Sequence, residues 1–362
     1  MSCQGEMDWL LSLLGFLRRS QAKTLSELAL ATTEVVRASL AELGRALASR
    51  TGGLVKHCIK RVDRFIGNPR IEPVEAMRGV VGYLARPRRR LVVSLDWVDI
   101  RQFWCLVLAA RLKGRAVPLV WAVYHPEAFF RSRNSIEEGL LRALRTMVPA
   151  ATAVLILADR GFGRAEMARL CQALGFDYLI RIQPNVFVRS PTFTGLLSRL
   201  PVRPGRRLLL RDVLYRRRDP VRQHLAVVWK SGQSEPWFLM TNLHHIKASY
   251  LARLYALRMT IEEYFRDTKS LRNGFALRLM LIRDPERLSR LLLVLALAYL
   301  VLLAVGLYAH RHGQPRQWCS NNRPGECSLF TIGRFMIRHG LPPPRSLLRL
   351  LKNEILAGGN WG

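Results

Sequence analysis

Four polar residues are spaced so that they lie on one side of a helix. The stretch from Tyr255 to Lys269 reads YALRMTIEEYFRDTK. At about 100° per residue, four of its side chains fall within an arc of roughly 60°, and we call them the polar row: Tyr255, Arg258, Glu262 and Lys269. The apolar residues gather on a different side: Leu257, Ile261, Tyr264, Phe265 and Leu271. The helix therefore carries a core-facing side and, apart from it, an aligned phenol, guanidinium, carboxylate and amine.

Two aspartates end apolar segments elsewhere in the chain. Residues 91–95 are mainly apolar and lead to Asp96, and AVLILAD (153–159) reads as a buried parallel strand that ends at Asp159. If these strands are neighbours, the two carboxylates meet and repel each other unless a cation joins them. With Glu262 they form what we call the acidic cluster, whose oxygen ligands suit Mg²⁺ or Mn²⁺. Two such ions can activate a water and stabilise the leaving oxygen in phosphodiester cleavage.

Each acidic residue also has an ordinary structural interpretation. Asp159 begins a DRG stretch that is a good turn by itself, and Glu262 is spaced to pair with Arg266 on a solvated helix face. Asp99 competes with Asp96, which we favour because it directly ends the apolar run. Glu263 neighbours Glu262 but falls outside the arc of the polar row. The joint arrangement, rather than any one residue, indicates a catalytic site.

The elements around these residues predict an α/β fold. We predict strands at 91–95, 103–112, 116–124, 153–159 and 177–182, with helices at 135–147, capped by Ser135, and at 164–174. Short strand-like pieces rich in proline follow and read as a β-rich insertion. A long helix at 247–272 then carries the polar row. The N-terminal part predicts one helix at 25–49 and a second, basic and amphipathic, at 55–68.

The charge balance favours a polyanionic partner. The 362 residues carry 57 basic and 26 acidic side chains, a formal net charge of +31, and 49 of the basic residues are arginine. Nucleic acid is the first candidate and an acidic membrane surface the second. The clusters RPRRR (86–90) and YRRR (215–218) are either phosphate contacts or solvated faces. The apolar run 291–307 is at the short edge of what spans a bilayer, and we predict a buried core helix instead.

The six cysteines do not form a metal-binding pattern. They lie at Cys3, Cys58, Cys105, Cys171, Cys319 and Cys327, with no C-x-x-C pair. This spacing argues against a zinc site and favours reduced thiols in a cytoplasmic protein.

The sequence resembles a known family at this point. The pattern Tyr-x2-Arg-x3-Glu-x6-Lys formed by the polar row looks like the signature of the insertion-sequence transposases of the DDE class known as the IS-four family. The second aspartate sits in LADRGFG, and a β-rich insertion precedes the glutamate, as such transposases usually have them. The resemblance covers roughly residues 55–310.

The resemblance implies a ribonuclease H-like mixed sheet flanked by helices. It implies Asp96, Asp159 and Glu262 as the catalytic residues and as ligands of two Mg²⁺ or Mn²⁺ ions. Tyr255, Arg258 and Lys269 would hold phosphates of the terminal nucleotides, and we add Arg266 and Arg160 as DNA contacts. Trp229 and Trp237 lie in the insertion, where an aromatic ring can stack on an unpaired base, although a core role is the alternative.

The implied activity is cut-and-paste movement of a DNA element. A nicked element end would supply the 3′-hydroxyl that attacks target DNA, and some family members pass through a hairpin. The alternatives are a ribonuclease H-like nuclease without strand transfer and an idle DNA-binding relic. The partners would be the terminal inverted repeats, target DNA and a second copy of the chain on DNA, in the cytoplasm at the bacterial nucleoid and without a membrane.

Five regions follow from this interpretation. They are a helical, DNA-binding region (1–85), the first part of the core (86–183), the β-rich insertion (184–246), the second part of the core (247–310) and a basic C-terminal region (311–362).

Overall fold

The computed structural model describes most of the chain. The described residues are 4–35, 37–85, 90–128, 133–244, 246–272, 274–313, 315–319 and 327–339. The basic cluster at 86–90 lies outside them except for Arg90, and so does the end of the basic C-terminal region from residue 340 onward.

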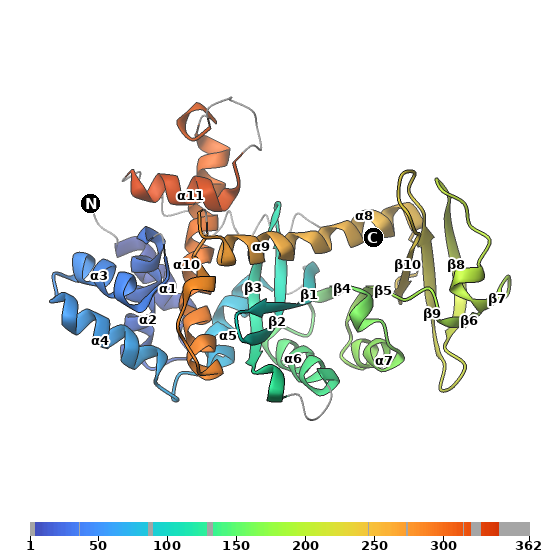
Figure 1. Ribbon diagram of the computed structural model, residues 1–362, viewed down its shortest axis with the longest axis horizontal. Coiled ribbons are helices and arrows are strands. Elements are labelled where there is room, and N and C mark those ends of the chain that lie inside the picture. Colours follow the sequence, from blue (N-terminus) through green and yellow to red (C-terminus); the bar gives the residue numbers. More distant parts are fainter. Residues whose placement is uncertain are drawn as a thin grey trace.

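One mixed sheet runs through the described part of the chain (Figure 1). Its strands, in spatial order, are β3 (Arg115–Tyr124), β2 (Phe103–Leu112), β1 (Arg90–Ile100), β4 (Ala153–Ala158), β5 (Asp177–Arg181), β10 (Trp237–Thr241), β9 (Val221–Val228), β8 (Arg207–Tyr215), β6 (Phe187–Arg189) and β7 (Thr194–Leu196). β1, β4 and β5 are parallel, and the other neighbours are antiparallel. Because β10 pairs with β5, the strands of the β-rich insertion extend the sheet of the core. The predicted mixed sheet flanked by helices is confirmed.

Helices cover both faces of the sheet. α8 (Ala248–Ala256) and α9 (Thr260–Lys269) cross one face, and α6 (Arg133–Met147) and α7 (Ala165–Ala173) lie against the other (Figure 1). The apolar side of α8 packs on Val92, Leu155 and Leu179, which alternate along their strands with residues of the opposite face. This packing fixes which strand residues face the helix that carries the polar row.

The predicted long helix 247–272 is wrong in two details. A 3₁₀ turn at Leu257–Met259 separates α8 from α9, and the helix ends at Lys269. Leu271 therefore lies beyond the helix and is 52% exposed rather than packed in the core. α6 also differs from its prediction, because it begins at Arg133 and Ser135 is an interior residue rather than the cap.

The N-terminal region is helical, as predicted, but it is divided differently. Its helices are α1 (Gln4–Leu13), α2 (Arg19–Glu34), α3 (Leu40–Thr51), α4 (Val55–Ile66) and α5 (Pro73–Leu84). The single helix predicted at 25–49 is wrong, because α2 ends at Glu34 and a new helix begins after Ser39. The Ser39 hydroxyl accepts a hydrogen bond from the backbone N–H of Glu42 at 3.2 Å, which caps α3.

The predicted buried apolar helix is confirmed as α10 (Pro285–His312). It is the one helix in the described ranges that is long and apolar enough to cross a membrane, and 94% of its most apolar 18-residue stretch is buried inside the protein. α11 (Leu329–Arg338) crosses it closely at two glycines, where a Cβ on Gly306 would lie 1.9 Å from the Leu329 carbonyl oxygen. α10 thus acts as the central core element between the N-terminal helices and the sheet.

Candidate active site

Asp96 and Asp159 occupy equivalent positions on neighbouring parallel strands. The last paired residues of β1 and β4 are Leu95 and Ala158, so the two aspartates come next on their strands. By the alternation of side chains, both lie on the face that α8 and α9 cover. The predicted proximity of these strands is confirmed. The prediction that the strand ends at Asp96 is wrong, because β1 continues to Ile100.

Arg258 lies between two carboxylates of the acidic cluster. Its Nη1 is 2.6 Å from Asp96 Oδ2 and 3.7 Å from Glu262 Oε1. Asp96 is only 9% exposed, and its Oδ1 also accepts the backbone N–H of Trp97 at 2.9 Å. The Glu262 side chain is 41% exposed, so the arrangement opens to solvent on the side of α9. A charge-assisted pair with Asp96 therefore fixes the 3₁₀ turn that carries Arg258 onto β1.

The charges of the site are coupled. Burial raises the pKa of Asp96 to about 7, Arg258 opposes this shift, and the charges of Asp159 and Glu262 add to it. Burial alone would lower the pKa of Arg258, but the neighbouring acidic groups outweigh it, so the pKa is raised. The three carboxylates therefore lie within electrostatic reach of one another, around one guanidinium.

The donor set fits a hard divalent cation in its chemistry. Carboxylate oxygens are the ligands that Mg²⁺ and Mn²⁺ prefer, and a cation would offset the burial and the carboxylate repulsion that together raise the pKa of Asp96. Among the described residues, no three histidine, cysteine, aspartate or glutamate side chains are arranged to hold an ion as they stand. Arg258 already binds Asp96 and Glu262, so an ion would compete with it for their oxygens.

Tyr255 sits deeper than the prediction of a DNA-facing row implies. It belongs to α8, and its side chain is buried between that helix and the sheet, with its ring edge-on to Trp237 at a centroid distance of 5.2 Å. Burial raises the pKa of Tyr255 to about 12, against the opposing effect of Arg258. The phenol therefore stays protonated at neutral pH and can donate a hydrogen bond beside Arg258.

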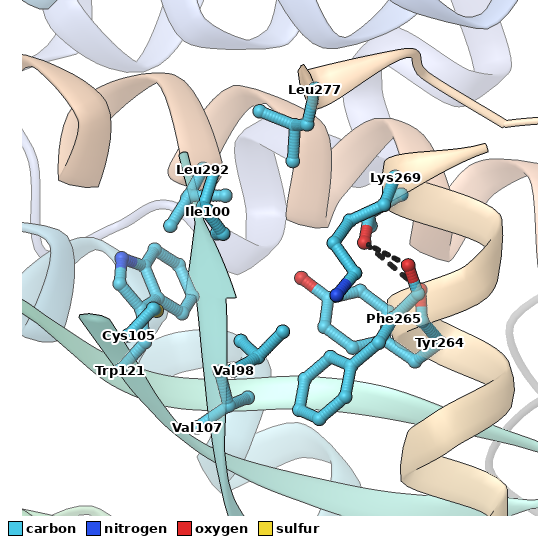
Figure 2. Close-up of a pocket in the computed structure, with 11 residues that line it drawn as sticks. Val98, Ile100, Cys105, Val107, Trp121, Tyr264, Phe265, Lys269, Leu277 and Leu292 are labelled. Carbon is cyan, nitrogen blue, oxygen red and sulfur yellow. Dashed lines mark hydrogen bonds between the residues drawn. The ribbon is translucent and has the colours of Figure 1, made fainter. Parts of the chain in front are cut away.

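Lys269 lies at the far end of the polar row. Its ammonium is 3.9 Å from Asp99 Oδ1, and the Asp99 side chain is 74% exposed. Its stem lines a cavity of about 10 Å³ between β1 and α9, whose other walls are mostly apolar (Figure 2). That volume holds about one water, so the cavity is a packing gap rather than a substrate pocket. Asp99, the competitor of Asp96, thus pairs with Lys269 and not with Arg258.

The remaining candidate residues are spread around this centre. Arg266 pairs with Glu263 at 3.0 Å rather than with Glu262, and Arg160 lies 3.4 Å from Glu235. The Lys230 ammonium lies over the Trp237 ring, 5.0 Å from the ring centre, in a cation–π contact. Trp229 lies just after β9, where its Nε1–H donates to the Gln233 carbonyl at 2.9 Å. Of the two tryptophans, Trp237 is the one in contact with the polar row.

Sequence reasoning missed a buried network on the opposite face of the sheet. Glu137 of α6 pairs with Arg164, and its Oε1 accepts the Trp97 indole N–H at 2.9 Å. Glu137 and Arg164 are both buried. Trp97 follows Asp96 in the chain and Arg164 follows the turn begun by Asp159, so this network ties the two aspartate segments together. A signal was present, because Glu137 shares the apolar stripe of α6 with Leu140 and Leu144.

The fold and a comparison with known families together support a transposase-type enzyme. Residues 131–301 match the family model described as the transposase DDE domain. The match supports a DDE transposase, with which the mixed sheet flanked by helices is consistent. It contains Asp159, Glu262 and the rest of the polar row, whereas Asp96 precedes it. No curated protein matches the chain.

The raised pKa of Asp96 predicts a pH-dependent stability in a metal-free, chelator-containing buffer. Unfolded Asp96 ionises near 3.8 and folded Asp96 near about 7, so between these values the folded chain holds a proton that the unfolded chain releases. Because of this proton, the wild type loses stability as the pH rises from about 3.8 to about 7. Above that range Asp96 causes no further loss. The Tm of Asp96→Asn minus the Tm of the wild type should therefore increase as the pH is raised from 4.5 to 8. A Tm difference that does not change with pH would contradict the assignment.

Proposed function

We propose that this chain is an IS-four type transposase that moves an insertion sequence by cut-and-paste. The single observation that supports this most strongly is the placement of Asp96 and Asp159 on adjacent parallel strands, under a helix that presents Arg258 and Glu262 to them. The family match supports the transposase class, and the signature of the polar row supports the finer assignment.

The acidic cluster would hold the catalytic ions. We assign Asp96, Asp159 and Glu262 as the ligands of two Mg²⁺ or Mn²⁺ ions. When bound, such ions supply Lewis-acid activation and stabilise charge on the attacking and leaving oxygens. The buried position of Asp96 excludes bulk water from one side of the cluster, and the exposed carboxylate of Glu262 leaves the other side open to DNA.

The polar row would bind the phosphates of the element end. Arg258 offers a planar guanidinium, Lys269 a compact ammonium and Tyr255 a protonated hydroxyl, all on the face that meets the acidic cluster. Arg160 and Arg266 carry exposed guanidinium groups at the margins of this face and would contact the backbone further along. Trp237, next to Tyr255, and Trp229, further out, are the aromatic side chains available for stacking on an unpaired base.

The other parts of the chain follow this assignment. Region 1–85 would bind DNA, 86–183 and 247–310 would form the catalytic core, 184–246 would be the insertion, and 311–362 would add a basic terminal region. The partners would be terminal inverted repeats and target DNA. Pairing of two element ends requires two active sites, so a homodimer on DNA is part of the proposal. Its place would be the cytoplasm, on the nucleoid.

End cleavage and joining test the proposal directly. Labelled duplexes are made from the genomic DNA that flanks the coding region on both sides, and purified protein is added with Mg²⁺ or Mn²⁺. We expect a nick at each element end and, with supplied plasmid, covalently joined products. Cleavage without joining would favour a nuclease that lacks strand transfer. Binding without cleavage under any divalent ion would favour a DNA-binding relic.

A further inference from the structure

Helices α3 and α4 form a tight helix–turn–helix unit at the surface. α3 ends at Thr51 and is capped by Gly52, which has a φ of +70° and whose N–H donates to the Ala48 carbonyl, and α4 begins at Val55. The helices cross at Gly44, where a Cβ would lie 2.4 Å from the side chain of Ile59. A short turn that contains glycine is typical of helix–turn–helix units, in which the second helix is the one that enters the major groove.

The two sides of α4 differ sharply. Cys58, Val62, Phe65 and Ile66 are buried against the neighbouring helices. The opposite side exposes Lys56, His57, Lys60 and Arg64, which follow one another at helical spacing. Lys56, Lys60 and Arg64 have no acidic partner within the described ranges of the chain.

The other two charged residues of α4, Arg61 and Asp63, form ion pairs with neighbouring helices, so the exposed side of α4 stays basic. Arg61 is turned toward α2, with Nη2 2.5 Å from Glu27 and 3.1 Å from the Thr24 hydroxyl, and so anchors the helix. The one acidic residue of α4, Asp63, pairs with Arg287 of α10. The uncompensated cations of α4 therefore all point away from the protein.

The start of α4 also exposes apolar side chains. Residues 51–57 are all exposed, and among them Leu54 is 69% and Val55 is 45% accessible. Large apolar side chains at the start of a basic helix are poorly solvated by water. They can instead be buried against thymine methyl groups at the edges of bases. A basic flank with an apolar tip matches the major groove of duplex DNA, which admits one α-helix.

We propose that α4 enters the major groove of double-stranded DNA, with Leu54 and His57 at base edges and Lys60 and Arg64 at the phosphate backbone. The inference rests on the proposed transposase function and names the element that selects the DNA. In such units the N-terminal residues of the second helix read bases, while its later turns and the first helix contact the backbone. Sequence selection then resides in α4, at a surface separate from the acidic cluster.

Fluorescence anisotropy in a chelator tests this without catalysis. The probes are a 30-bp duplex from the DNA flanking the coding region and a shuffled duplex of equal composition. Lys60→Ala/Arg64→Ala should weaken binding to both by about ten-fold or more, and should reduce the slope of log affinity against log salt by about 2. Leu54→Ala/His57→Ala should lose most of the preference for the flanking duplex, with little change on the shuffled one.

A matched variant controls for charge alone. Arg142→Ala/Arg338→Ala also removes two exposed cations, from α6 and α11, and should bind both duplexes within about two-fold of the wild type. Thermal melts should coincide for all variants, since the changed side chains are exposed. Equal losses in the control, wild-type binding by the α4 variants, or no duplex binding by the wild type would each overturn the inference. Failure of the proposed function is seen separately, as normal binding with no cleavage when Mg²⁺ is added.

Discussion

Asp159→Asn and Asp96→Asn should each reduce end cleavage by at least about a thousand-fold, or roughly 4 kcal/mol of transition-state stabilisation. Asparagine keeps the size of each side chain but removes the charge that would bind a divalent ion and that balances Arg258. Because α4 lies elsewhere, binding of the flanking duplex should stay within about two-fold of the wild type. Single-turnover nicking at saturating protein measures the chemical step apart from binding.

Neighbouring acidic residues supply the controls for this result. Asp99→Asn and Glu263→Gln remove a carboxylate three residues and one residue away from the proposed ligands, and both side chains pair outside the acidic cluster. Their nicking rates should stay within about ten-fold of the wild type, while Glu262→Gln should fall with the two aspartate variants. A thousand-fold loss in Asp99→Asn with normal Asp96→Asn activity would move the first catalytic aspartate to position 99. Full activity of all three cluster variants would reject the site.

A second large effect is expected at the buried Glu137–Arg164 pair. Arg164→Met leaves the carboxylate of Glu137 buried with only the Trp97 indole as a partner, and Glu137→Leu leaves the Arg164 guanidinium buried without its carboxylate. Removing one partner of a buried ion pair typically costs roughly 3–5 kcal/mol of unfolding free energy. Urea denaturation followed by circular dichroism measures this loss.

The double variant separates the pair from its parts. Glu137→Leu/Arg164→Met removes both charges, so it should recover much of the stability that either single change loses. The exposed pair Arg78–Glu75 on α5 is the control, and its disruption should cost less than about 1 kcal/mol. Additive losses in the double variant would show that the two side chains do not act as a pair. Because the network joins the segments after Asp96 and Asp159, the recovered double variant should still cleave more slowly than the wild type.

Local patterns in the sequence were sufficient for much of the fold and for the residues of the site. Apolar runs of strand length predicted β2, β3 and β4, and the long apolar run predicted α10, because these segments are buried on all sides. The spacing of Arg258 and Glu262 predicted that they face the same direction, since a helix sets that geometry without help from the rest of the chain. The parallel pairing of β1 with β4 followed from the positions of Asp96 and Asp159 only once a sheet order was assumed.

Tertiary structure decided what each of these residues touches. Packing against Trp237 draws Tyr255 into the core, and the 3₁₀ turn at Leu257–Met259 brings Arg258 to Asp96, which lies 162 positions away in sequence. The pairing of Glu137 with Arg164 and the outward face of α4 likewise depend on contacts between elements that are distant in the chain or joined by a sharp turn. Periodicity reports only the side of an element on which a residue lies. Which partner meets that side is set by the packing of the whole molecule, so charge pairing and burial in the site required the structure.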